Sequence, residues 1–146
     1  MKNYLFPICK VLQSGTLKLF SNWRVDGIEN IPPMGPLIIV ANHQSNLDPP
    51  ILGSSINRRV YFLAKSTVFK GRFANWFLRS YGAFPVNRER RSDIGAYKWV
   101  LEQLNHGNPV VLFPEGTRNE GAMIKAKNGV AQIAIKSQAP ILPIGI

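Results

Sequence analysis

The stretch PLIIVANHQSNLDPP, residues 36–50, joins a short apolar run to a polar turn and two prolines. The run at 37–41 is typical of a buried strand, and Asp48 before Pro49 favours extended backbone followed by a helix. A helix through the turn itself would place His43 and Asp48 about 140° apart, too far to touch. A turn can instead bring the imidazole and the carboxylate together, and such a pair forms a general base.

Two interpretations of this turn are open on its own sequence. Aspartate before proline is a good helix N-cap, so Asp48 can serve the helix alone while His43 is an ordinary turn residue. In the other interpretation, the carboxylate holds the imidazole in the tautomer that a base requires. The residues that follow the other strands decide between the two.

Short apolar runs alternate with amphipathic stretches along the rest of the chain. The predicted strands are 37–41, 60–64, 83–86, 110–113 and 141–146, and the predicted helices are 49–55, 69–80, 92–106 and 128–137. Helix 92–106 is the clearest, because Ser92 can cap it and Gly107 can end it. The alternation predicts an α/β fold with a mostly parallel central sheet flanked by helices. The sequence stops inside an apolar run that is typical of a core strand, so we expect the domain to be truncated at its C-terminus.

Polar residues follow each of the first four predicted strands, where an open parallel sheet binds its ligands. In chain order they are His43 with Asp48, then Lys65, then Arg88, and then Glu115, Gly116, Thr117 and Arg118. Gly116 lets backbone approach a ligand, and Arg118 can hold a phosphate with two parallel hydrogen bonds. Each cation alone is more typical of a solvated surface. Their convergence on His43 would form a site that deprotonates a hydroxyl of a phosphorylated substrate.

The composition restricts the class of protein further. The 146 residues fit one domain, and 18 Lys and Arg against 8 Asp and Glu give a net charge of +10, which attracts an anionic partner. One cysteine excludes an internal disulfide, and together with two separated histidines it predicts no metal site. The chain has no Gly-x-Ser-x-Gly elbow, so we expect the attacking hydroxyl to belong to the substrate.

Four blocks of the sequence together resemble the glycerolipid acyltransferase family, which contains the 1-acylglycerol-3-phosphate acyltransferases. They are NHQSNLD at 42–48, GAFPVNR at 82–88, FPEGTR at 113–118 and APILPIGI at 139–146. The resemblance covers about residues 23–146 and leaves 1–22 as a separate N-terminal segment. It implies the fold of that family and transfer of a fatty acyl group from acyl-CoA or acyl carrier protein to 1-acyl-sn-glycerol-3-phosphate. The product would be phosphatidic acid, and glycerol-3-phosphate or a lysophospholipid is an alternative acceptor.

The resemblance also implies a role for each motif residue. His43 would be the base and Asp48 its support. Lys65 and Arg118 would bind the acceptor phosphate with Arg88 nearby, and Glu115, Gly116 and Thr117 would shape the acceptor site. No cofactor or metal is implied, because the acyl thioester is a co-substrate.

The first 22 residues predict an amphipathic helix. Leu5, Ile8, Leu12 and Leu19 recur near helical spacing, with Lys10 on the other side. Packing on its own domain and lying in the membrane interface are both open for this helix. Because a lysophosphatidate stays in the bilayer and a basic surface is drawn to anionic lipid, we expect a peripheral protein at the cytoplasmic face. We expect no transmembrane span within this sequence.

Two other classes of protein fit the charge less well. A basic nucleic-acid-binding module would account for the +10, but the chain has none of the usual recognition motifs and PEGTR would have no role. We therefore expect no nucleic-acid partner. A non-catalytic membrane-binding relative is also conceivable, although the intact His43 and Asp48 favour an enzyme.

Overall fold

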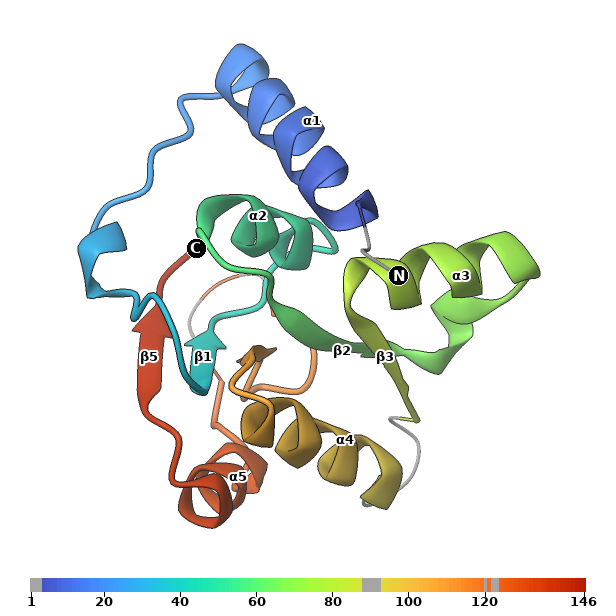
Figure 1. The fold of residues 1–146 in the computed structure, drawn as a ribbon, viewed down its shortest axis with the longest axis vertical. Helices are drawn as coiled ribbons and strands as arrows, with labels where there is room; N and C mark the ends of the chain where they lie inside the picture. Colours follow the sequence, from blue (N-terminus) through green and yellow to red (C-terminus); the bar gives the residue numbers. More distant parts are fainter. Residues whose placement is uncertain (1–3, 88–92, 120, 122–123) are drawn as a thin grey trace.

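A computed structural model describes residues 4–87, 93–119, 121 and 124–146. Within these residues the chain forms one five-stranded sheet with the order β3-β2-β4-β1-β5, and every strand pair is parallel (Figure 1). The strands are β1 Leu37–Ala41, β2 Tyr61–Lys65, β3 Ala83–Val86, β4 Pro109–Leu112 and β5 Ile141–Ile144. The predicted α/β fold with a parallel sheet is confirmed.

Helices cover both faces of this sheet (Figure 1). The described residues form α1 Leu5–Phe20, α2 Asp48–Ser55, α3 Arg72–Tyr81, α4 Ile94–Asn105 and α5 Gly129–Ser137, with short 3₁₀ helices η1 Ile28–Asn30 and η2 Ser66–Phe69. Because side chains of a strand alternate between its faces, Leu37 and Ile39 join the core beneath α1, α2 and α3. Ile38 between them joins the core beneath α4 and α5. Both faces of β1 are therefore buried.

The region after β2 differs from the predicted helix at 69–80. It divides into η2, which ends at Phe69, and α3, which begins at Arg72. Gly71 precedes α3 with a positive φ of 86°, which glycine adopts without strain. The second strand is displaced by one residue, so that Lys65 is its last residue instead of following it.

Two predicted helix starts were also wrong. Asp48 is the first residue of α2 rather than its N-cap, which is Leu47. For α4 the N-cap is Asp93, whose side chain accepts a hydrogen bond from the backbone N–H of Ala96. Ser92, the predicted cap, lies outside the described residues. The caps of α2 and α4 therefore differ from the predicted ones.

Helix α1 packs on the domain through a partly polar face. Phe6 is buried, the Lys10 ammonium donates to the backbone oxygen of Ile56, and burial lowers the pKa of Lys10. Much of the apolar surface of α1 lies outside, because Ile8, Val11, Leu12 and Leu19 are all exposed. The helix therefore packs on its own domain and also presents an apolar stripe to its surroundings.

Candidate active site

The turn after β1 brings His43 and Asp48 into direct contact. The Nδ1 atom of His43 lies 2.8 Å from Oδ2 of Asp48, and both side chains are buried. The same oxygen accepts the backbone N–H groups of Gln44 at 2.7 Å and Ser45 at 2.8 Å. Because Oδ2 is an acceptor in all three bonds, Nδ1 is the donor and Nε2 is left to accept a proton.

The loop that follows the neighbouring strand β4 fixes the backbone of His43. Its N–H donates to Oε1 of Glu115 at 3.1 Å, and its carbonyl accepts the N–H of Asn119 at 2.9 Å. The ring of Phe113 stacks on the imidazole with a centroid separation of 4.1 Å and an interplanar angle of 21°. These contacts hold the imidazole in one orientation, although Glu115 is 72 residues away along the chain.

Glu115 is a buried carboxylate that contacts backbone. Its Oε1 accepts from His43, its Oε2 accepts the N–H of Ile124 at 3.3 Å, and the residue is 3% exposed. Among the residues that the structure describes, the donors to this carboxylate are two backbone N–H groups and no cation. Glu115 therefore contacts the backbone of His43 and is not among the residues that line the cavity beside the imidazole.

A cavity of about 520 Å³ opens in front of His43, and we call it the His43 cleft. Lys65 at the end of β2 and Arg118 after β4 also line this cleft. Parallel strands end at the same edge of a sheet, which explains how residues from distant positions meet there. Most of the remaining wall is apolar, and it includes Phe62, Leu63, Ala64, Val68, Phe77, Leu78, Tyr81 and Phe113. The cleft thus offers one imidazole, two cations and an apolar lining.

The other predicted residues are placed around the cleft. Gly116 lines a neighbouring cavity of about 270 Å³ together with Lys127, and a Cβ at Gly116 would lie 2.6 Å from the lysine Nζ. Thr117 is exposed on the same loop. Arg88 lies outside the described residues, and its neighbour Asn87 lines the smaller cavity.

One wall of the cleft comes from helix α1, which no motif indicated. Gln13 lines the cleft, and its Oε1 accepts hydrogen bonds from Ser54 Oγ at 3.0 Å and Tyr81 OH at 2.8 Å. Burial raises the pKa of Tyr81 to about 12, against a smaller opposite effect of its bond to Gln13. A single glutamine in a predicted amphipathic helix gives no signal of such a contact.

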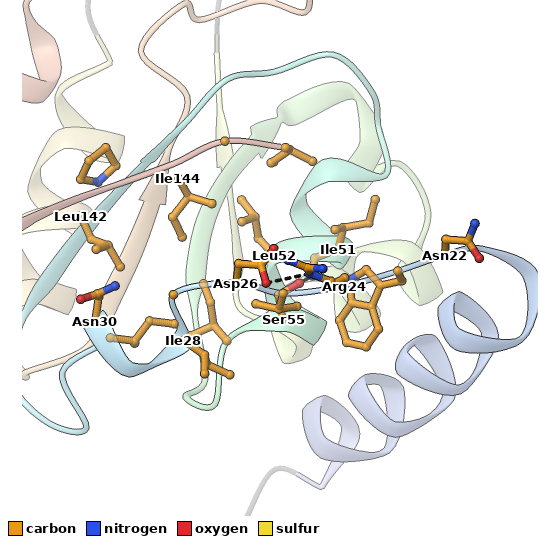
Figure 2. Close-up of a pocket in the computed structure, with 18 residues that line it drawn as sticks. Asn22, Arg24, Asp26, Ile28, Asn30, Ile51, Leu52, Ser55, Leu142 and Ile144 are labelled. Atoms are coloured by element: carbon orange, nitrogen blue, oxygen red, sulfur yellow. Dashed lines mark hydrogen bonds and ion pairs between the residues drawn. The ribbon is translucent and has the colours of Figure 1, made fainter.

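A second large cavity lies away from these residues. It encloses about 570 Å³ between the segment 22–31, α2, and β5 with the two residues that follow it, and we call it the Arg24 cavity (Figure 2). Arg24 and Asp26 form an ion pair at 2.8 Å, and their side chains are 79% and 72% exposed. The remaining labelled side chains are mostly aliphatic or small and polar. This cavity has a similar volume but no buried ionisable group among its lining residues.

The fold and the His43 cleft define the chain as an α/β protein whose candidate active site combines a histidine–aspartate pair with two cations. It belongs to the acyltransferase family, whose model matches residues 22–146.

Named relatives agree with this family. The chain is 33% identical over 140 residues to a chloroplastic 1-acyl-sn-glycerol-3-phosphate acyltransferase of Brassica napus, covering 94% of this chain and 40% of the relative. It is 29% identical to the 1-acyl-sn-glycerol-3-phosphate acyltransferase of Bacillus subtilis, covering 95% of this chain and 69% of the relative. The chain therefore spans less than half the length of the plant relative.

A solved structure has the same fold. The crystal structure of the 1-acyl-sn-glycerophosphate acyltransferase of Thermotoga maritima superposes with a TM-score of 0.79 at 32% identity. The match covers 94% of this chain and 56% of that one. Among the helices that the structure describes, none has the length and apolar character needed to cross a bilayer.

Proposed function

We propose that the protein transfers a fatty acyl group from an acyl thioester to the free hydroxyl of 1-acyl-sn-glycerol-3-phosphate, which yields phosphatidic acid for phospholipid biosynthesis. The observation that carries this proposal is that His43, paired with Asp48, shares one cleft with Lys65 and Arg118. The names of the relatives support the same acceptor.

The reaction uses His43 as a general base. Its Nε2 takes the proton of the acceptor hydroxyl while the oxygen attacks the thioester carbonyl, and Asp48 stabilises the imidazolium that forms. The tetrahedral intermediate then collapses, the carbon–sulfur bond breaks, and the imidazolium returns the proton to the leaving thiolate. The donor is acyl-CoA or acyl-acyl carrier protein, and the reaction needs no further cofactor.

The cations of the cleft would bind the phosphate of the acceptor, and loop residues would shape the rest of the acceptor site. Lys65 and Arg118 are both exposed at the cleft and would bind the phosphate, and the guanidinium can do so with two parallel hydrogen bonds. Arg88, on the segment after β3, is proposed to assist them. Gly116 and Thr117 would shape the acceptor side of the loop, while Glu115 positions His43 through its backbone.

We also propose that the protein works as a peripheral protein at the cytoplasmic face of a membrane. The exposed residues Ile8, Val11, Leu12 and Leu19 of α1 support this location, since they can enter the interface of a bilayer. The net charge of +10 would draw the protein to anionic lipid.

An assay of the purified protein with a matrix of donors and acceptors tests the proposed function. Acyl-CoA and acyl-acyl carrier protein are each combined with 1-acyl-sn-glycerol-3-phosphate, glycerol-3-phosphate, a lysophospholipid and a monoacylglycerol. We expect the highest kcat/KM with 1-acyl-sn-glycerol-3-phosphate. Faster transfer to the monoacylglycerol, which has no phosphate, would contradict the roles of Lys65 and Arg118.

A further inference from the structure

The beginning of α3 and the preceding η2 expose a cluster of apolar side chains, which we call the α3 tip. Its members are Val68, Phe73 and Trp76, whose exposures are 49%, 74% and 56%. The rings of Phe73 and Trp76 lie 5.9 Å apart and form one patch. Large aromatic side chains contribute most when buried, so their exposure on neighbouring turns indicates a surface that is covered during function.

The α3 tip is continuous with the His43 cleft. Phe73, Phe77 and Tyr81 lie one helical turn apart, with centroid separations of 6.1 Å and 6.3 Å. Phe73 is exposed, whereas Phe77 and Tyr81 line the cleft and Tyr81 is only 4% exposed. Val68 belongs both to the α3 tip and to the lining of the cleft. An apolar surface therefore runs without interruption from the outside of α3 to the candidate active site.

The charge around the α3 tip favours a lipid surface as its partner. Residues 65–81, from the end of β2 to the end of α3, contain four Lys and Arg and no Asp or Glu. Lys70 and Arg72 are exposed within this segment, directly beside the aromatic residues. Aromatic side chains with flanking cations suit the interface of an anionic leaflet. Tryptophan lies at the level of the headgroups there, and the cations bind the lipid phosphates. Protein interfaces are also rich in aromatic residues and arginine but are depleted in lysine, so Lys70 beside the rings favours lipid.

We propose that the α3 tip inserts into an anionic membrane leaflet and holds the mouth of the His43 cleft against the bilayer. The acyl chain of the lipid acceptor would then pass along Val68 and Phe77 without crossing water. This inference rests on the proposed function, because a lipid substrate is what requires the cleft to open at a bilayer. It assigns membrane contact to a second element besides α1.

Vesicle flotation of a Phe73→Ala/Trp76→Ala double variant tests the inference. The vesicles are phosphatidylcholine alone or an equal mixture with phosphatidylglycerol. We expect wild type to bind the mixed vesicles and the double variant to lose about tenfold or more in partition per ring removed. Ile135→Ala is the matched control, because Ile135 is 73% exposed on α5, on the opposite face of the sheet, and its loss should leave binding unchanged.

A second measurement separates this inference from the proposed function. With a short-chain, monomeric lysophosphatidate and no vesicles, the double variant should turn over at the wild-type rate, because neither ring lines the cleft. Unchanged vesicle binding by the double variant overturns the inference even if the enzyme transfers acyl groups. Absence of transfer by wild type with every acceptor refutes the proposed function, whereas the flotation result still decides whether the tip binds lipid.

Tryptophan fluorescence gives an independent readout. Mixed vesicles should shift the wild-type emission to shorter wavelength, and Trp76→Phe should reduce that shift while keeping most of the binding; any remainder is assigned to Trp23, which follows α1. A shift in Trp76→Phe as large as in wild type would contradict insertion of the α3 tip. If wild type is a dimer that the double variant dissociates, and vesicle binding is unaffected, the tip contacts a second copy and the proposal is wrong.

Discussion

The His43 cleft and the Arg24 cavity have similar volumes, about 520 and 570 Å³, but different chemistry. In the first, the side chains of His43 and Asp48 are 7% and 4% exposed and are fixed by further hydrogen bonds from backbone. In the second, the charged pair of Arg24 and Asp26 is mostly exposed, and its partners are two residues apart. Burial and hydrogen bonding of the ionisable pair therefore identify the candidate site better than volume does.

The largest expected effect is that of His43→Ala. Loss of the base should lower kcat for acyl transfer by about 10²–10⁴-fold, because positioned base catalysis contributes that much. Initial rates with saturating acceptor measure it, and circular dichroism checks that the fold is kept. Arg24→Ala is the control in the other cavity. Equal rates for the two variants would contradict the assignment of the active site to the His43 cleft.

Asp48→Asn should have the next largest effect. The amide can keep an oxygen for the backbone donors of Gln44 and Ser45, but it removes the charge that stabilises the imidazolium. We expect kcat to fall by about 10²-fold or more with little change in melting temperature. Asp26→Asn is the matched control. A rate near wild type for Asp48→Asn would mean that Asp48 only organises the turn.

Lys65→Ala and Arg118→Ala should act on acceptor binding. Each loses a charge-assisted hydrogen bond to phosphate, which contributes about 1.5–3 kcal/mol, so KM for the acceptor should rise by about 10- to 100-fold. KM for the acyl thioester is measured in the same experiment and should change little. Lys98→Ala on α4 controls for loss of a surface lysine, and a similar rise in that variant would point to general electrostatic attraction instead.

Glu115→Gln distinguishes the two roles considered for this residue. An amide can accept from only one of the two backbone N–H groups, so we expect the free energy of unfolding to fall by about 1–3 kcal/mol. Because His43 is then held less firmly, kcat should fall while KM for the acceptor is unchanged. A rise in KM for the acceptor without a fall in kcat would mean that Glu115 contacts the acceptor, as the sequence predicts. Glu102→Gln, at an exposed position on α4, serves as the control.

The smallest effects are expected in the Arg24 cavity. The ion pair of Arg24 and Asp26 is exposed, and such pairs contribute about 0–1 kcal/mol to stability. Arg24→Ala should therefore keep both the melting temperature and kcat/KM close to wild type. A loss of activity comparable to that of Lys65→Ala would show that this cavity also binds substrate.

Local sequence was sufficient to predict the features that depend on neighbouring residues alone. The strands at 37–41 and 83–86 have the predicted bounds, and the contact of His43 with Asp48 follows from a short turn that ends at two prolines. The meeting of Lys65 and Arg118 at one cleft follows from the parallel sheet. The apolar runs, the turn residues and the order of the elements were enough for these three predictions.

Contacts between distant segments could not be predicted in this way. The bonds of Glu115 to the backbone of His43 and of Gln13 to Tyr81 depend on how the loop after β4 and helix α1 are placed in space. The inward position of Lys10 has the same cause, because a lysine opposite an apolar stripe predicts a solvated face. Sequence patterns describe each element, whereas these bonds depend on pairs of elements.

A crystal structure with bound 1-acyl-sn-glycerol-3-phosphate tests the account most directly. We expect the phosphate within hydrogen-bond distance of Lys65 Nζ and the Arg118 guanidinium, and the free hydroxyl within hydrogen-bond distance of His43 Nε2. A phosphate bound in the Arg24 cavity, or a hydroxyl that lies away from the imidazole while the phosphate occupies the cleft, would contradict it.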